Sequence, residues 1–229
     1  MCTRAAGVEP DGEDSGGWDY RGLSLLKLGR PAEALAAHDR ALAIDSRGAD
    51  TWFHKGNALR ALGNYAEALA AYDRGLTINP RNAGVSYKRG LVLHALGRHR
   101  DAVASYDAVL EFEPNHEDAW YGRARALEAL RCPEEAVVSY DHVIALNPKS
   151  AKALQDKGAL LLTIGQHTDS ERVLEQALCA DPENAFTFAL IGITRYCQGR
   201  TQEALDSFDD ALAIHSNTAT CWWVRAPLF

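Results

Sequence analysis

The chain has 229 residues, a formal net charge of −7 at pH 7 and 47% hydrophobic residues. Its length allows one large or two ordinary domains, and its acidic balance argues against a nucleic-acid-binding surface. Its apolar runs fall short of the ~18 residues that a membrane-spanning helix needs. We therefore expect neither nucleic acid nor membrane among its partners.

The first segment, residues 1–14, is acidic and lacks the continuous apolar stretch of a signal peptide. We expect it to form a disordered leader. The five cysteines are odd in number and show no C-x-x-C spacing; they are Cys2, Cys132, Cys179, Cys197 and Cys221. This pattern favours free thiols in a reducing compartment, and we predict a cytoplasmic protein.

After the leader, the sequence matches itself at an offset of 34 residues, without an insertion or deletion, through six copies. The copies cover residues 15–48, 49–82, 83–116, 117–150, 151–184 and 185–218. In the clearest copy, Trp52–Leu62 and Tyr65–Ile78 are two segments of helical periodicity separated by Gly63 and Asn64. A hairpin of about thirty residues cannot bury its apolar faces alone, so the fixed period predicts an all-α solenoid of stacked antiparallel helix hairpins.

Several places recur, counted from the first residue of each copy. Place 8 is small in every copy, place 24 is usually aromatic, and place 15 is glycine in all copies but one. Small residues at place 8 let the two helices approach closely, and glycine at place 15 suits a left-handed residue that ends the first helix. Arg131 stands at place 15 of the fourth copy, where the same conformation would cost about 1 kcal/mol.

Residues at the predicted helix starts support this pattern. Pro31 and Pro133 fit a first helical turn, and Asn64 with Glu67 resembles a capping box. The residues placed to cap the next first helix are Asn82, Ser150, Asn184 and Thr218.

The recurring residues resemble the tetratricopeptide repeat (TPR) pattern over residues 15–218. The clearest copy carries it at Trp52, Gly56, Leu59, Ala68, Tyr72 and Pro80. The resemblance implies a right-handed superhelix in which places 2, 5, 6, 9, 12 and 13 of the first helices line a concave groove. The fifth and sixth copies depart from the pattern at Ser170, Leu174, Arg195 and Gln198, around which we expect looser packing.

Catalytic and metal-binding motifs are not evident. The glycines stand at structural places, and no two of the eight histidines have H-x3-H spacing. His38, His99 and His167 occupy places where other copies carry structural residues, and the acidic pairs fit a solvated face. We predict no enzymatic activity, no cofactor and no metal site.

Residues that differ between copies at the groove places are the candidate binding residues. They are Phe53, His54, Asn57, Arg60, Tyr87, Lys88, Leu91, Tyr121 and Arg125. Three of them form a row of aromatics in consecutive copies, edged by hydrogen-bond donors, which suits an extended or helical peptide carrying acidic groups. The alternative is that the aromatics pack sideways against neighbouring repeats and the charges only solvate the groove.

Residues 219–229 begin a seventh copy that contains Trp222 and Trp223, and Pro227 should end its helix early. Three interpretations compete: a stub tucked onto the sixth copy, an exposed patch that drives self-association, and truncation of a longer array. We favour a stub that covers the second helix of the sixth copy and leaves Trp223 partly exposed, giving weak homo-oligomers.

Together these features predict a non-enzymatic scaffold that holds a peptide or protein segment in its groove. Two alternatives stay open. One is the regulatory or substrate-recruiting array of an enzyme whose catalytic part is elsewhere or lost, and the other is a self-assembling structural protein.

Overall fold

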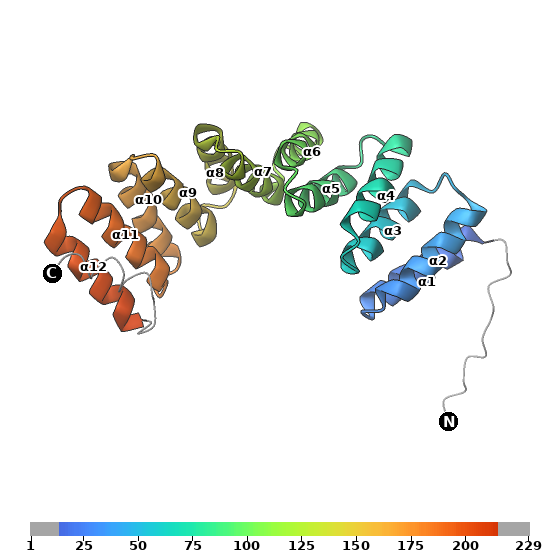
Figure 1. Ribbon diagram of the computed structural model, residues 1–229, viewed down its shortest axis with the longest axis horizontal. Coiled ribbons are helices and arrows are strands. Elements are labelled where there is room, and N and C mark those ends of the chain that lie inside the picture. The colour runs from blue at the N-terminus through green and yellow to red at the C-terminus, as the bar shows by residue number, and fades with distance from the viewer. Residues whose placement is uncertain (1–13, 215–229) are drawn as a thin grey trace, which may run out of the picture. The chain divides into compact units, whose positions relative to one another are not determined.

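The computed structural model describes residues 14–214, and over that range the chain forms twelve helices and no strand (Figure 1). The first helices of the six hairpins are α1 (Ser15–Lys27), α3 (Ala49–Ala61), α5 (Ala83–Ala95), α7 (Glu117–Ala129), α9 (Ala151–Thr163) and α11 (Ala185–Cys197). The second helices are α2 (Pro31–Ile44), α4 (Tyr65–Ile78), α6 (His99–Phe112), α8 (Pro133–Leu146), α10 (His167–Ala180) and α12 (Thr201–Ile214). The predicted all-α repeat fold is confirmed.

The acidic leader up to residue 13, the capping role of Thr218 and the C-terminal stub lie outside the described residues and stay predictions. Among the helices that are described, none has both the length and the apolar character to cross a membrane. The described cysteines with free thiols are Cys132, Cys179 and Cys197.

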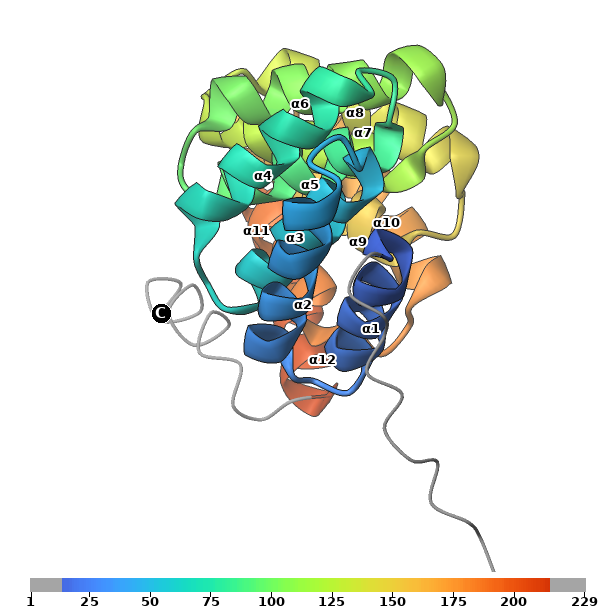
Figure 2. The same cartoon turned by 90° about the vertical axis from the view of Figure 1, so that its right-hand side faces the viewer.

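The chain divides into two compact units, the first ending at Gly122 and the second beginning at Arg123, within α7. In the first unit α1 lies antiparallel beside α2, and α3 beside α4 (Figures 1 and 2). In the second unit α9 pairs with α10, and α11 with α12. The handedness of the predicted superhelix stays a prediction.

The turn between the helices of each hairpin uses one residue in the left-handed region. Gly29, Gly63, Gly97, Gly165 and Gly199 have φ between 71° and 80°. Arg131 takes the same conformation in the fourth hairpin, with φ of 61°. The prediction that Arg131 replaces glycine in a left-handed turn is confirmed.

Helix starts agree with the sequence only in part. The side chains of Asn82 and Asn184 each accept a hydrogen bond from a backbone N–H of the following helix, at 3.1 Å. Pro31 and Pro133 stand in first turns as predicted. The capping box predicted at Asn64 is wrong, because this residue has ψ of 65° and its side chain caps no N–H. Ser150 likewise forms no side-chain cap, although it stands at the start of α9.

The core of five of the six hairpins is built on the contact of a glycine at place 8 with the side chain at place 24. Tyr72 is fully buried, and a Cβ added to Gly56 would lie 2.4 Å from its ring. In the last hairpin a Cβ on Gly192 would lie 2.4 Å from the ring of Phe208. The glycine is required because the ring occupies the volume that a side chain would fill.

Ion pairs recur between consecutive hairpins, joining a basic residue at place 7 to an aspartate at place 25 of the preceding copy. They are Lys55–Asp39 at 2.7 Å, Arg89–Asp73 at 2.7 Å and Lys157–Asp141 at 2.5 Å. The aspartates are half exposed, so each pair adds little stability. Their regular position instead helps to fix how one hairpin stacks on the next.

The looser packing expected in the fifth and sixth copies is wrong for the described residues. Leu174 is fully buried against Gly158, and the Ser170 hydroxyl donates to the Gly158 carbonyl at 2.8 Å. Arg195 donates to Glu171 at 2.7 Å. In the fifth copy a leucine takes the place of the usual aromatic ring, and in the sixth copy Arg195 joins a polar network while Phe208 keeps the aromatic contact.

Candidate functional site

The first helices of the first unit carry eight of the nine predicted binding residues. All eight are half-buried: Phe53, His54, Asn57, Arg60, Tyr87, Lys88, Leu91 and Tyr121. The ninth, Arg125, is exposed and belongs to the second unit. We call the surface formed by the groove places of α3 and α5 the first-helix face.

Two rings of the predicted aromatic row pack against their neighbours. The centroid of Phe53 lies 6.1 Å from that of Tyr72, and the centroid of Tyr87 lies 6.2 Å from that of Tyr106. Tyr87 also lies 5.0 Å from the ring of His116, the last residue of the same copy. Sideways packing therefore occurs at both rings, which fixes their positions while part of each stays accessible.

The positive charge of Arg60 acts on two tyrosines, Tyr72 and Tyr87. Burial raises the pKa of Tyr72 to about 12, with Arg60 acting in the opposite direction. The Tyr72 hydroxyl is therefore protonated at neutral pH and donates to Asn57 Oδ1 at 2.9 Å. The Nε atom of Arg60 is buried and has no hydrogen-bond partner among residues 14–214.

Charges of both signs surround Tyr87. Burial raises the pKa of Tyr87, the negative charge of Asp118 raises it further, and the positive charge of Arg60 lowers it. Lys88 Nζ lies 5.2 Å from the centroid of the Tyr87 ring, within cation–π range. The face thus presents a fixed aromatic ring with cations close to it.

A surface depression of about 510 Å³ lies within the second unit. It is lined by Arg125, Glu128, Arg131, Pro133, Asp156, Ala159, Leu160, Thr163, Ile164 and Phe186. Most of these residues stand at groove places of the fourth to sixth copies. Its lining is largely apolar and also includes the charged residues Arg125, Glu128, Arg131 and Asp156, and Phe186 is 45% exposed.

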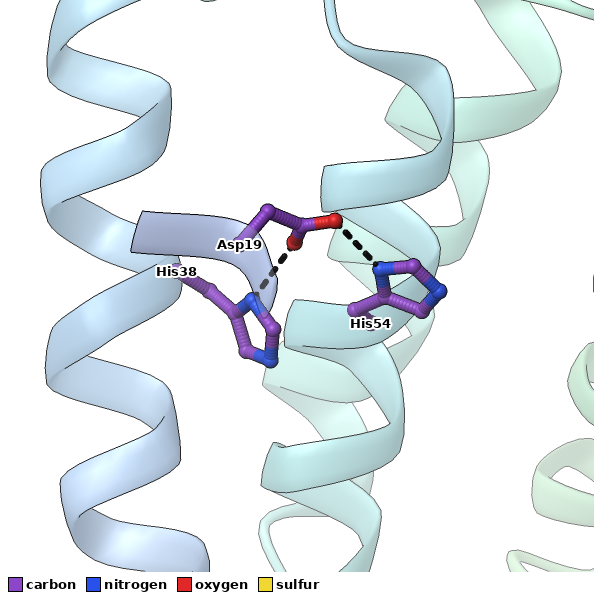
Figure 3. A group of neighbouring side chains, drawn as sticks. All are labelled: Asp19, His38 and His54. Atoms are coloured by element: carbon purple, nitrogen blue, oxygen red, sulfur yellow. Dashed lines mark hydrogen bonds and ion pairs between the residues drawn. The ribbon is translucent and has the colours of Figure 1, made fainter. Parts of the chain in front are cut away.

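Three metal-ligand side chains meet at the other end of the chain. Asp19 on α1 accepts from Nδ1 of His38 on α2 and from Nδ1 of His54 on α3, each at 2.8 Å (Figure 3). Burial alone would raise the pKa of Asp19, but the hydrogen bonds and charges of the two histidines hold it well below its usual range. Asp19 is therefore a carboxylate that joins three helices.

The comparisons with known proteins agree with this geometry. Residues 56–97 match a family model described as TPR repeat, and residues 87–151 match one described as tetratricopeptide repeat. Residues 56–151 of this chain are therefore tetratricopeptide repeats. No curated protein sequence matches it.

Solved structures share the fold of this chain at low sequence identity. YrrB, described as a TPR protein with an unusual peptide-binding site, has a TM-score of 0.74 and 21% identity over 83% of this chain and 98% of its own. MamA from Desulfovibrio magneticus RS-1 has a TM-score of 0.70 and 20% identity over 74% of this chain and 96% of its own. A tetratricopeptide repeat protein from Parabacteroides merdae has a TM-score of 0.74 and 19% identity over 92% and 84%.

The TPR register also shows which residues the sequence prediction missed. Only Arg125 of the predicted set lines the depression in the second unit. The prediction followed aromatic residues, whereas the depression is lined by aliphatic side chains of α9 and by Phe186 at place 2 of the last copy. The groove places of the fourth to sixth copies include Glu128, Asp156, Ala159, Thr163 and Phe186, whereas Leu160 and Ile164 stand outside those places.

Proposed function

We propose that this chain is a non-enzymatic scaffold whose first helices hold a peptide or protein segment that carries acidic groups. TPR repeats generally serve as protein-interaction scaffolds, and the crystal structure of YrrB is described as having a peptide-binding site. The proposal is supported chiefly by the depression of about 510 Å³ at groove places of the second unit.

The depression suits an apolar anchor side chain of the bound segment. Leu160, Ile164 and Phe186 offer apolar contacts, and burial of an anchor in such a pocket supplies most of the affinity in many interfaces. Arg125 and Arg131 in the same lining can pair with carboxylates that flank the anchor.

The first-helix face of the first unit suits an acidic segment for a different reason. Arg60 has a buried Nε with no partner, so a carboxylate that reached it would satisfy a donor that is otherwise unpaired. Lys88 and the Asn57 side chain lie on the same face, and the packed ring of Tyr87 offers a rigid contact. Because this surface is preformed, most of the conformational entropy lost on binding is lost by the partner.

The test is a peptide-display selection on the full chain, followed by affinity measurements on the selected peptides. We expect acidic peptides with an apolar anchor. The double variant Tyr87→Ala with Arg125→Ala should weaken their binding about 30-fold or more, as loss of interface hot spots does. The control is Arg100→Ala, an exposed residue on the second helix α6, which should leave binding unchanged.

Circular dichroism must show that all three proteins keep the same helix content. Equal binding by the wild type and the double variant would contradict the proposal, and so would the selection of basic peptides. Capture of partners from a native lysate with the same three proteins would then identify the natural ligand. We propose that this ligand is met in the cytoplasm.

A further inference from the structure

Asp19, His38 and His54 form the one group of three metal-ligand side chains found within residues 14–214. The ligand atoms lie within 4.8 Å of one another, and both carboxylate oxygens are engaged, one by each imidazole (Figure 3). All three residues belong to the first unit and come from three different helices. The group therefore lies where the first hairpin meets the second.

The other copies show which residues helix packing alone requires at the places that Asp19 and His38 occupy. Place 5 is Asp19 in the first copy and Phe53, Tyr87, Tyr121, Gln155 or Ala189 in the others. Place 24 is His38 in the first copy and Tyr72, Tyr106, Tyr140, Leu174 or Phe208 in the others. Within the described hairpins, only the first has a ligand residue at both places.

His38 fills the same position as the aromatic rings of the other hairpins. It is fully buried, and a Cβ added to Gly22 would lie 2.3 Å from its ring. Phenylalanine and tyrosine satisfy this packing elsewhere, as Phe208 does against Gly192. The imidazole therefore brings hydrogen-bonding and ligand chemistry that packing does not require.

The tautomer of His38 depends on Asp19 alone. An ionised carboxylate accepts hydrogen bonds, so Nδ1 carries the proton when it faces Asp19 at 2.8 Å. Nε2 is buried and has no hydrogen-bond partner in the part of the chain that the structure describes. Among the described residues, no hydrogen bond at Nε2 opposes transfer of the proton from Nδ1 to Nε2. A cation that took the place of the proton between Nδ1 and Asp19 could therefore bind the Nδ1 lone pair.

Solvent reaches the group from one side. The side chains of Asp19 and His54 are 16% and 19% exposed. A depression of about 410 Å³ is lined by Asp19, His54, Leu23 and neighbouring residues. An ion could enter from this side and keep water as a further ligand.

We propose that Asp19, His38 and His54 bind a divalent transition-metal ion such as Zn²⁺, through two imidazole nitrogens and one carboxylate oxygen, with water completing the coordination. Imidazole and carboxylate are common ligands of zinc and cobalt. Ligands around a tetrahedral zinc lie about 3.3 Å apart, so the group would contract by about 1.5 Å, which rotation of the half-buried His54 side chain supplies. The ion would tie α1 and α2 to α3. This proposal departs from the sequence-based expectation that the chain has no metal site.

The test titrates the untagged, metal-free full chain with Co²⁺, followed by visible absorption, and then displaces Co²⁺ with Zn²⁺. We expect one ion per chain. His38→Phe keeps an aromatic ring in the packing position and should weaken binding ~100-fold or more, because loss of a ligand costs at least as much as loss of a residue that orients one. His54→Ala removes the more exposed histidine and should have the same effect. Zn²⁺ should also raise the melting temperature of the wild type but not of His38→Phe.

The matched control is His99→Ala. His94 and His99 lie with their Nδ1 atoms 3.3 Å apart on another hairpin of the same unit, but they belong to no group of three ligands among the described residues. This variant should bind Co²⁺ as the wild type does. Unchanged binding by His38→Phe, loss of binding in His99→Ala, or a thiolate-to-cobalt charge-transfer band from the cysteines would each overturn the proposal.

Discussion

Place 15 of the repeat has a positive φ in all six hairpins, although its residue is not the same in all of them. Five hairpins turn at a glycine and the fourth turns at Arg131, all with positive φ. A side chain in the left-handed region is strained, and glycine is free of this strain. The positive φ of Arg131 was predictable from the sequence, because Arg131 stands at the place where the other five copies carry glycine.

Replacing Arg131 with glycine should therefore stabilise the protein. The gain in unfolding free energy should be about 0.5–1 kcal/mol, since relief of backbone strain exceeds the extra flexibility of the unfolded chain. The reciprocal variant Gly165→Ala should lose about 1 kcal/mol from backbone strain alone, because nothing lies within 4 Å of the added Cβ. Urea denaturation measures both changes, and equal stability of Arg131→Gly and the wild type would contradict the account.

Place 8 makes a second prediction at the residue scale. Gly56→Ala would drive a methyl group to 2.4 Å from the fully buried ring of Tyr72. The ring cannot move without disturbing the core, so the variant should lose about 1–3 kcal/mol. Thermal and urea denaturation would detect this loss, and a variant as stable as the wild type would show that the helices can separate without cost.

At the scale of helices, the last two hairpins are joined by a charge network. Glu171 on α10 accepts from Arg195 on α11 at 2.7 Å and from Arg200, just before α12, at 2.6 Å. Burial alone would raise the pKa of Glu171, but the two arginines hold it below its usual value of 4.5. The carboxylate is thus more acidic in the folded protein than in the unfolded chain.

This network should make stability depend on pH. A depressed pKa contributes stability that is fully present above pH 4.5 and is lost as the pH falls through the folded-state pKa of Glu171. Glu171→Gln should therefore be less stable than the wild type at pH 7, and the difference should shrink as the pH is lowered below 4.5. Urea denaturation at several pH values measures it; a difference that stays constant with pH would rule out this role for Glu171.

The arrangement of side chains between helices was less predictable than the helices themselves. Arg195 and Leu174 looked like defects in the repeat pattern, yet one joins a network and the other is fully buried. The group of Asp19, His38 and His54 was not predicted, because ligand spacing within a single helix does not reveal it. Its members stand at places 5 and 24 of one copy and place 6 of the next, and only the stacked hairpins bring them together.

At the scale of the whole molecule, the places that recur in nearly every copy differ from the places that could select a partner. Places 8 and 15 serve helix packing and helix ends in nearly every copy, so, apart from Arg131 at the depression, they carry no information about a partner. The groove places vary, and they form the first-helix face in one unit and the depression of about 510 Å³ in the other. We expect the choice of partner to depend on these variable residues.

Site-specific photo-crosslinking tests this account most directly. A benzophenone amino acid replaces Leu91 on the first-helix face, or Arg100 on the second helix α6 as the control, and a selected acidic peptide is added before irradiation. The account predicts that the peptide is crosslinked from position 91 and not from position 100. Crosslinks from position 100 alone, with none from position 91, would contradict it.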